Sequence, residues 1–544
     1  MIEGNFVDVV SGDIVPARLN LYENHLVRIT QRPVSKNHYI IPGMIDAHIH
    51  IESTKLCPSR FAEMAVPHGV TSVIADPHEI ANVMGMEGIN YMLADGASVP
   101  MRFFFTAPSC VPATPWETSG AVIDWRDIRQ MLEDPQFVAL GEVMNYPGVI
   151  NEDFDVMGKI EVARQLAKPI DGHCPELTGA PLDKYIFAGI STDHESTKLD
   201  EAIEKHEKGL TIMVREGSAS RNMKDLMPFA REHECFLVTD DMEADELIRG
   251  YMDKRLKMAV EYGMDPIHAI RAVTLWPAKH YELPIGTVEI GRPLDFVIVK
   301  DLESFEVKEV YIDGRLVAKD GQPLFEVKPK EVHPAILHQD RSPQDFLIPF
   351  NKDRVKVRVI KVLERQIESL ASEAELFTIN GQLRPDPVRD IAIIAVANRY
   401  HNAPLALGFV QGFGLKRGAI ASTIAHDSHN IVAVGVDPTS LARAVNGVSK
   451  IGGYMATDGM RDASLELDVA GLMSTSYSQD VVDQDAAVFD LVRDMGCGLP
   501  SPFMTLSFQC LLVLPELKIS DKGLFDSRHL QFVDPVIGQE KTAG

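Results

Sequence analysis

The sequence predicts an α/β protein built on a TIM-like (β/α)8 barrel, with a flanking small β-domain and a C-terminal α/β domain. Between residues 39 and 241, eight short apolar runs each end in polar residues, and helix-like amphipathic segments separate several of them. Alternating strand and helix patterns are typical of a parallel sheet, and eight strands within roughly 200 residues suit a closed barrel. A doubly wound open sheet is the alternative, but it would gather fewer strand ends in one place.

The eight apolar runs are the predicted barrel strands. They occupy residues 39–50, 71–79, 102–109, 137–144, 169–175, 189–196, 210–218 and 235–241. Helical patterns with an apolar face are predicted at residues 58–69, 155–168, 198–209 and 221–234. We therefore place the barrel at residues 43–280.

The segments on either side of the barrel have other patterns. Residues 1–42 and 281–330 read as short strands separated by turn residues. Residues 331–544 mix predicted strands and helices, with strands at 355–363, 390–400 and 430–436 and helices at 438–453 and 485–496. We expect these last residues to form the C-terminal α/β domain.

The composition excludes several classes of protein. The formal net charge is −25 and the chain has no basic block, which argues against a nucleic-acid partner. No apolar run reaches the roughly 18 residues that a membrane span needs. The N-terminal residues lack a signal-peptide pattern, and the six cysteines are scattered without a CxxC motif. We therefore expect a cytoplasmic protein with reduced thiols and no membrane association.

The polar residues at the ends of the predicted strands contain an unusual number of histidines. Catalytic groups of such barrels lie at the C-terminal ends of the strands, which share one face. The residues at these ends, in strand order, are His48 and His50; Asp76, His78 and Glu79; Glu142; His173; Asp193, His194 and Glu195; Arg215 and Glu216; and Asp240 and Asp241. Seven of the eight strands thus direct imidazoles, carboxylates or a guanidinium to one mouth.

This set of side chains predicts a site for two divalent metal ions. Imidazole and carboxylate ligands without thiolates suit Fe, Mn, Zn or Co. We expect one ion on His48 and His50, a second on His173 and His194, and Glu142 as the bridge between them. Asp240 would complete the site and accept a proton from a water that the metals activate. The chemistry implied is hydrolytic attack on a carbon that carries nitrogen or oxygen.

The motifs also resemble a known family. The stretch "PGMIDAHIHIEST" is similar to the first-strand signature of the amidohydrolase superfamily, and other motifs resemble its adenine deaminases. These include "VIADPHEIANVMG", "GEVMNYPGVI", "DGHCPELTGAPLDKYIFAGISTDHES" and "GFVQGFGLKRGAIASTIAHDSHNIVAVG", and together they span nearly the whole chain.

The resemblance implies conversion of adenine and water into hypoxanthine and ammonia, a reaction of purine salvage. It implies two divalent metal ions per chain, Fe or Mn with Zn as an alternative, and Glu142 in the place of a carboxylated lysine. It also implies that residues 1–42 and 281–330 form one small β-domain. We further expect a homo-oligomer, a dimer or larger.

For the remaining candidate site residues, the sequence leaves more than one role open. Glu195 either protonates a ring nitrogen of the substrate or braces His194. The residues Arg215, Glu216, Ser218 and Asp241 would contact a purine, although an Arg–Glu pair can also cap the next helix. His78 and Glu79 would bind substrate or a further metal, or brace a loop. The motif "AHDSHN", with His426, Asp427 and His429, is either a wall of the active site, a further metal site or a hydrogen-bonded turn.

Some positions depart from the pattern of the family. Met242 stands where an arginine is usual, "GYMD" at residues 250–253 replaces a Gly-His-Ile-Asp run, and Cys174 and Glu176 replace small residues. The family has an Arg-His pair near the first strand of the C-terminal domain, and this chain has "NRYHN" at 398–402 in that place. These departures leave two alternatives open: another amidohydrolase that acts on a modified purine or a cyclic amide, and a non-catalytic barrel.

Overall fold

The computed structural model describes residues 2–35, 37–218, 220–332, 336, 340–363 and 368–538. The chain divides into two compact units. The first contains Met1–His78, Asn90–Cys110 and Ile123–Lys330, and the second contains Glu79–Ile89, Val111–Val122 and Glu331–Gly544. Among the described residues, no helix has the length and apolar character to cross a membrane.

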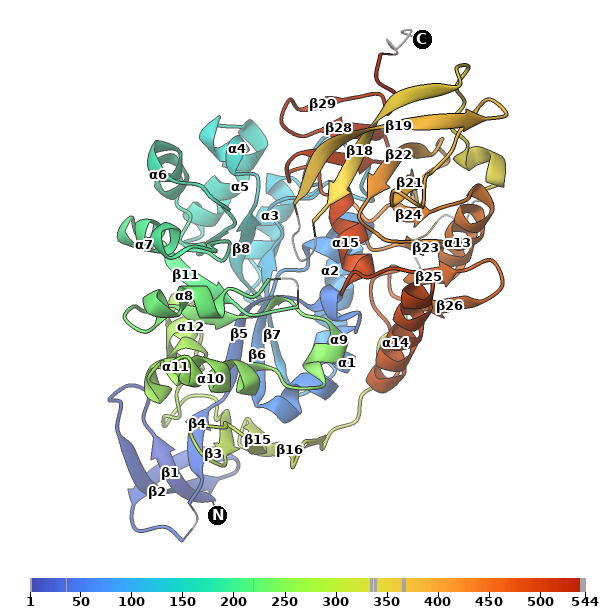
Figure 1. Ribbon diagram of the computed structural model, residues 1–544. Coiled ribbons are helices and arrows are strands. Elements are labelled where there is room, and N and C mark those ends of the chain that lie inside the picture. Colours follow the sequence, from blue (N-terminus) through green and yellow to red (C-terminus); the bar gives the residue numbers. More distant parts are fainter. Residues whose placement is uncertain are drawn as a thin grey trace. The chain divides into compact units, whose positions relative to one another are not determined.

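The first unit contains the predicted barrel of parallel strands. Its strands are β5 (Met44–His50), β6 (Val70–Ala75), β7 (Arg102–Ala107), β8 (Phe137–Val143), β9 (Ile170–Gly172), β10 (Thr192–Asp193), β11 (Thr211–Arg215), β12 (Phe236–Val238) and β13 (Asp240–Asp241). Figure 1 shows β5, β6, β7 and β8 side by side, with helices outside them. The predicted fold class is confirmed.

The strands form two hydrogen-bonded sheets that together make the ring. One sheet has the order β13-β5-β6-β7-β8-β9, and the other has the order β10-β11-β12. Between β12 and β13 lies only Thr239, so the predicted eighth strand is interrupted at that residue. Between β9 and β10 the amide of Ser191 donates to the carbonyl of Ile170 at 2.9 Å. The ring therefore has two seams, one at Thr239 and one between β9 and β10.

Helices follow the strands. They are α1 (Pro58–Ala65), α2 (His78–Gly96), α3 (Trp125–Leu132), α4 (Tyr146–Ile150), α5 (Phe154–Gln165), α6 (Gly179–Phe187), α7 (Leu199–Glu207), α8 (Met223–Ala230), α9 (Ala244–Leu247), α10 (Met252–Glu261), α11 (Pro266–Ala272) and α12 (Leu275–His280). The four helices predicted from amphipathic patterns correspond to α1, α5, α7 and α8. Each is shorter than its pattern, because turns and left-handed residues such as Ala167 after α5 and Gly209 after α7 follow them.

The end of the second barrel strand differs from the prediction. Strand β6 ends at Ala75, so His78 and Glu79 do not lie on a strand but in the first turn of α2. Pro77 occupies the N-cap position, and proline is well suited to the start of a helix because its missing N–H would have no partner there. The helix is kinked at Gly85, which has φ 56°.

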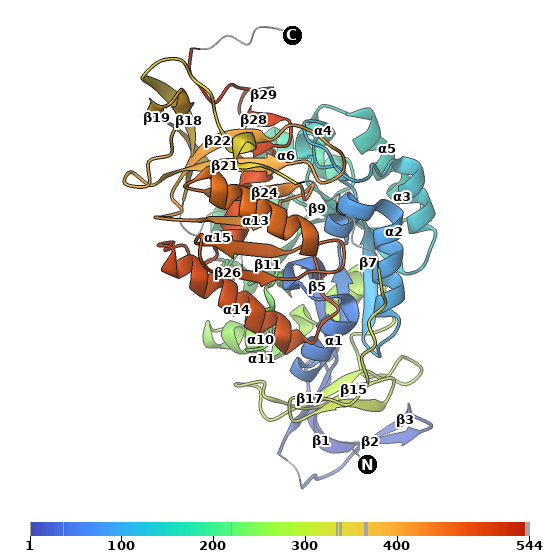
Figure 2. The ribbon, with the colours of Figure 1, turned by 90° about the vertical axis from the view of Figure 1, so that its right-hand side faces the viewer.

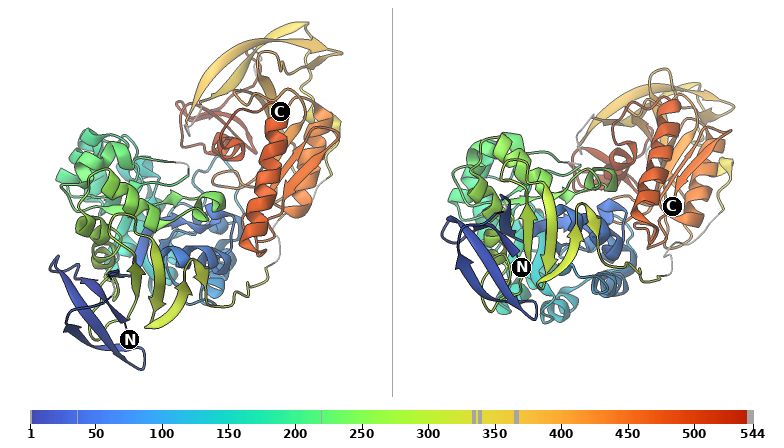
Figure 3. Two further views of the ribbon diagram at one scale, coloured as in Figure 1. Left: turned by 60° about the horizontal axis from the view of Figure 1, so that its bottom comes forward. Right: turned by 90° about the horizontal axis from the view of Figure 1, so that it is seen from below.

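The two outer segments of the first unit share one sheet of eight strands. Its order is β17 (Gln322–Pro323), β16 (Arg315–Lys319), β15 (Val307–Ile312), β14 (Phe296–Val299), β4 (Tyr39–Pro42), β1 (Ile2–Val7), β2 (Ile14–Tyr22) and β3 (His25–Gln31). Strand β14 pairs antiparallel with β4, which joins the segments before and after the barrel. Figure 3 shows β1–β3 as a blue twisted ribbon at the N-terminus.

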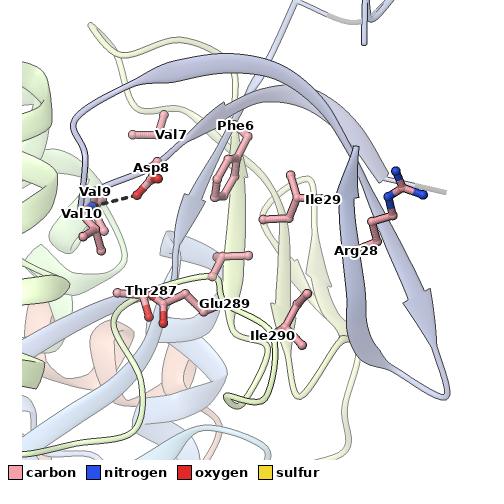
Figure 4. A pocket seen from close by; sticks show the side chains of 11 residues that line it. Phe6, Val7, Asp8, Val9, Val10, Arg28, Ile29, Thr287, Glu289 and Ile290 are labelled. Carbon is pink, nitrogen blue, oxygen red and sulfur yellow. Dashed lines mark hydrogen bonds between the residues drawn. The ribbon is translucent and has the colours of Figure 1, made fainter. Parts of the chain in front are cut away.

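A surface pocket with a volume of about 490 Å³ opens in this small β-domain (Figure 4). Phe6, Ile29 and Ile290 supply apolar side chains to it, and Arg28 and Glu289 supply charged ones. None of the predicted metal ligands lines this pocket.

The second unit is built on a mixed sheet of nine strands. Its order is β20 (Gln382–Leu383), β19 (Ser369–Ile379), β18 (Arg354–Val362), β22 (Ala406–Gln411), β21 (Ile391–Ala397), β24 (Ile431–Gly435), β23 (Ala419–Ser422), β25 (Tyr454–Thr457) and β26 (Asp462–Leu465). Helices α13 (Pro438–Ile451) and α14 (Ser478–Asp494) pack against it, as Figure 2 shows. The unit also contains α15 (Pro502–Ser507) and a small sheet of β27 (Leu517–Ser520), β28 (Gly523–Asp526) and β29 (Gln531–Phe532).

Candidate metal centre

Glu142, at the end of β8, faces histidines from three other strand ends. Its Oε2 lies 2.8 Å from Nδ1 of His173 and 3.0 Å from Nε2 of His194. Its Oε1 lies 3.5 Å from Nε2 of His50. The carboxylate therefore turns one oxygen toward β9 and β10 and the other toward β5, as a bridging group would.

Asp240 stands on the opposite side of this group. Its Oδ1 lies 3.2 Å from Nε2 of His50 and 3.5 Å from Nε2 of His48. Strand β13 pairs with β5, with Asp240 opposite Ile49, so the backbone holds the three side chains together. Asp240 has φ 60°, a left-handed conformation that Asp and Asn tolerate better than most residues do.

The donors fit a metal centre. Nε2 of His48 and Nδ1 of His194 are buried and have no hydrogen-bond partner among the described residues. Nδ1 of His50 lies 3.2 Å from the backbone carbonyl of Asp76. Because Nδ1 must carry the proton to donate there, Nε2 of His50 is left with a lone pair, the usual arrangement for a metal-bound histidine.

The ligand atoms form overlapping groups small enough to hold an ion. Three such groups, each with its atoms within 4.8 Å of one another, are His48–His50–Glu142, His48–His194–Asp240 and Glu142–His173–His194. Burial raises the pKa of Glu142, but His173 and His194 hold it well below its usual range. Glu142 is therefore ionised at neutral pH.

Arg215, from the end of β11, binds two carboxylates of the centre. Its Nη1 donates to Oδ2 of Asp240 at 2.9 Å, and its Nη2 donates to Oε2 of Glu195 at 3.0 Å. Burial raises the pKa of Glu195, but Arg215 and the neighbouring imidazoles of His173 and His194 lower it to about 2. Arg215 thus pairs with Glu195 and Asp240, and the interpretation that it pairs with Glu216 is wrong.

Comparison with known proteins shows two family models along the chain. Residues 39–317 match the amidohydrolase family, and residues 367–531 match the adenine deaminase C-terminal domain. An adenine deaminase of Methanothermobacter thermautotrophicus is 47% identical over 97% of this chain and 98% of its own length. An adenine deaminase of Methanosphaera stadtmanae is 43% identical over 99% of this chain and 100% of its own length.

The chain belongs to the adenine deaminase family. The resemblance seen in the sequence motifs is thereby confirmed. The family assignment covers both units, because each relative aligns over almost the whole chain.

Among the other predicted site residues of this adenine deaminase family member, His78 lies close to Glu142, and Asp241 and Glu216 bond within nearby loops. Nδ1 of His78 lies 3.5 Å from Oε1 of Glu142. Oδ1 of Asp241 accepts a hydrogen bond from the hydroxyl of Ser53 at 2.6 Å. Glu216 accepts the amide proton of Met223 at 3.2 Å, so it caps the start of α8.

Ser218 also bonds within a loop. Its hydroxyl accepts the amide proton of Glu243 at 2.9 Å, and its own amide donates to the carbonyl of Asp241 at 2.8 Å. The structure therefore gives Glu216 and Ser218 bracing contacts. Their contact with a substrate stays a prediction.

Within the second unit, Glu79 contacts both histidines of the "AHDSHN" motif. Its Oε1 lies 3.1 Å from Nδ1 of His426, and its Oε2 lies 3.2 Å from Nε2 of His429. The spacing is compact enough for a metal ion. However, the amide of Ala425 donates to Nδ1 of His429 at 3.2 Å, which places the ring proton of a neutral His429 on Nε2. That proton faces Glu79, so the contacts favour direct pairing over a metal on His429.

Asp427 belongs to the same buried cluster. Its Oδ1 lies 3.7 Å from Nδ1 of His426. Burial, together with the negative charge of Asp427, raises the pKa of the nearby Glu117 to about 8. The motif is therefore a buried polar cluster with Glu79 and Glu117, both of which come from segments that follow barrel strands.

Three of the residues that depart from the family pattern, Met242, Cys174 and Tyr251, are buried in the protein interior. Met242 is fully buried, and its sulfur accepts a hydrogen bond from Nη2 of Arg255 at 3.2 Å. The amide of Cys174 donates to Asp193 at 3.1 Å, and the hydroxyl of Tyr251 donates to Asp46 at 2.6 Å. These three residues therefore bond to protein groups in the interior.

Several residues near the centre were not foreseen from the sequence. Lys205 on α7 is fully buried and binds Asp193 at 2.9 Å and Glu201 at 2.7 Å. Asp46 and Asp171 are also buried, and burial raises the pKa of Asp46 to about 6 and that of Asp171 to about 7. A signal existed for these two, because each stands two residues before a predicted ligand, in "DAH" and "DGH".

Proposed function

We propose that the protein hydrolyses adenine to hypoxanthine and ammonia at a centre of two divalent metal ions. The ligands would be His48, His50, Glu142, His173, His194 and Asp240, as predicted from the strand ends. One observation carries the proposal: the two oxygens of Glu142 face different histidines, with Oε1 toward His50 and Oε2 toward His173 and His194. Membership of the adenine deaminase family supports adenine as the substrate.

Two metal ions, when bound, supply Lewis-acid activation of water at neutral pH. Fe or Mn are the proposed metals and Zn is the alternative, because the donors are imidazoles and carboxylates without a thiolate. The six cysteines are all buried and none belongs to the ligand groups of the first unit.

The protein's own groups would move the protons. The oxygen of water forms a bond to C6 of adenine, and the bond from C6 to the amino nitrogen breaks. One proton of the water ends on ring nitrogen N1, and the other ends on the amino group, which leaves as ammonia. Asp240 would accept the proton of the attacking water and pass it to the departing amine.

Glu195 would protonate ring nitrogen N1 of adenine. Because its pKa is held at about 2, the carboxylate is ionised at neutral pH and must take up a proton before it can donate one. Arg215 holds Glu195 and Asp240 on one guanidinium, so the two proton carriers keep a fixed distance from each other.

The decisive experiment loads the purified protein with Mn(II) or Fe(II), adds adenine, and follows ammonia release together with the change in purine absorbance. We expect ammonia and hypoxanthine in equal amounts. The metal content of the same sample is measured by mass spectrometry. Two metal ions per chain without ammonia release would contradict adenine as the substrate, and a panel of modified purines and cyclic amides would then be assayed.

A further inference from the structure

The two seams of the barrel each contain one buried aspartate. The first seam lies at Thr239, between β12 and β13, and the second lies between β9 and β10, where the six-stranded sheet ends and the three-stranded sheet begins. Asp46 lies at the first seam and Asp171 at the second, and both are at most 1% exposed. Backbone contacts across the second seam include the hydrogen bond from Ser191 to Ile170, and side chains add further bonds at both seams.

At the first seam, the carboxylate of Asp46 accepts hydrogen bonds from two segments that lie far away in the sequence. The hydroxyls of Thr239 and Tyr251 both donate to Oδ2, the latter at 2.6 Å. The amide of Thr239 donates to Oδ1 at 3.3 Å. Asp46 stands two residues before His48, and Thr239 stands one residue before Asp240. The carboxylate therefore joins the backbones that carry these two site residues.

The second seam repeats this arrangement with different residues. Oδ1 of Asp171 accepts hydrogen bonds from the hydroxyls of Thr192 and Tyr281, each at 2.9 Å. The Thr192 hydroxyl also accepts the amide proton of Gly172 at 3.1 Å. Asp171 stands two residues before His173, and Thr192 stands two residues before His194.

Both tyrosines come from the segment that follows the last barrel strand. Tyr251 directly precedes α10, and Tyr281 directly follows α12. Hydrogen bonds from hydroxyls to a carboxylate are stronger than those between neutral groups, particularly where water is excluded. The helices after the barrel thus supply the third member of each cluster.

We propose that Asp46–Thr239–Tyr251 and Asp171–Thr192–Tyr281 are two positioning clamps, each of which sets the spacing of one half of the metal-ligand group. The first clamp sets the spacing of His48 and Asp240, and the second sets that of His173 and His194. The inference rests on the proposed metal centre. Metal ligands need support of this kind, because small displacements of the donor atoms weaken binding.

The test measures how fast each metal ion leaves. Wild type, Tyr251→Phe, Tyr281→Phe and the double variant are loaded with Mn(II), mixed with excess chelator, and sampled over time for protein-bound metal. Each single variant should release one equivalent about 10- to 100-fold faster than wild type and keep the other at the wild-type rate. The double variant should release both equivalents fast, because the clamps act on different halves.

Matched variants separate positioning from a general loss of stability. Tyr454→Phe removes a buried hydroxyl in the second unit and should leave metal release unchanged. Thr192→Ser keeps the hydroxyl that reaches Asp171 and should release metal at the wild-type rate, whereas Thr192→Val should behave as Tyr281→Phe does. Thermal unfolding of each apo variant shows whether the fold is retained.

Two results would overturn the inference. One is metal release at wild-type rates in both tyrosine variants, and the other is equal acceleration of both equivalents by either variant alone. If wild type itself binds fewer than two metal ions, the proposed centre fails instead, so the two failures are distinguishable.

Discussion

Arg215 bonds Asp240 through Nη1 and Oδ2 at 2.9 Å, and its second amino group holds Glu195. Replacement by glutamine removes the positive charge that lowers the pKa of Glu195, so burial should raise that pKa above 2. Since the ionised carboxylate is the working form, the acid limb of the pH profile of kcat/KM should move to higher pH. We expect kcat to fall by about 10²-fold at neutral pH.

The measurement for Arg215→Gln is a pH–rate profile with adenine between pH 5 and pH 9. Arg221→Gln is the matched control, because the exposed guanidinium of Arg221 pairs with Glu246 at the surface. An unshifted acid limb in Arg215→Gln would show that the guanidinium does not set the protonation of Glu195.

Asp240→Asn should lower kcat by about 10²-fold or more, because the amide cannot accept the proton of the attacking water. Asparagine is chosen because it tolerates the left-handed backbone that Asp240 adopts, so the fold should persist. The comparison measures kcat at matched metal content, since Asp240 is also a proposed ligand. Turnover close to that of wild type would remove Asp240 from proton transfer.

Lys205→Met should destabilise the protein by about 3 to 5 kcal/mol. The ammonium binds Asp193, Glu201 and the carbonyl of Cys174, and none of it is exposed to water. Its removal leaves buried carboxylates without their cation. Urea unfolding measures the change.

A second substitution distinguishes this effect from lost packing. Glu201→Gln in the Lys205→Met background removes one of the two carboxylates that have lost their cation, and it should recover part of the stability. Lys208→Met is the surface control, because Lys208 pairs with Asp183 at the surface, where such a pair contributes about 1 kcal/mol or less.

His280 should make the protein less stable in mild acid. Burial lowers the pKa of its imidazole to about 4, whereas an unfolded histidine titrates near 6.5. Below about pH 6.5 the unfolded chain therefore binds a proton that the native protein does not, and stability falls until the pH reaches the native pKa. Between pH 7 and pH 5 the contribution of this group should fall by about 2 kcal/mol.

The measurement compares the free energy of unfolding at pH 7 and at pH 5, for wild type and for His280→Gln. The loss between pH 7 and pH 5 should be smaller in the variant, because the titrating group is gone while every other group remains. An identical loss in both proteins would mean that the imidazole is already solvated in the native state.

The sequence alone was sufficient to predict the barrel and to name six side chains that the structure brings close together. Each barrel strand is a short apolar run, and the polar residue that ends it must lie at the common face of a parallel barrel. His48, His50, Glu142, His173, His194 and Asp240 follow from this rule. Local patterns also predicted helices α1, α5, α7 and α8, because amphipathic periodicity is a property of neighbouring residues.

Other features of the site needed the folded chain. Arg215 follows Glu195 by 20 residues and precedes Asp240 by 25, and nothing in the spacing distinguishes it from a partner of Glu216. The sequence places His78 and Glu79 on a strand, because Pro77 can either end one element or begin the next. Lys205 reads as an ordinary helix-surface lysine, and only the packing of α7 against Cys174 and Asp193 buries it.

The local sequence determined which residues reach the proposed metal centre, since strand and helix patterns depend on neighbours in the chain. The tertiary structure decided how they are held, since the supporting contacts join segments far apart. Asp46 meets Thr239 across 193 residues and Tyr251 across 205, and Asp171 meets Tyr281 across 110. No pattern within a single strand encodes these pairs, because their partners become neighbours only when the ring of strands closes.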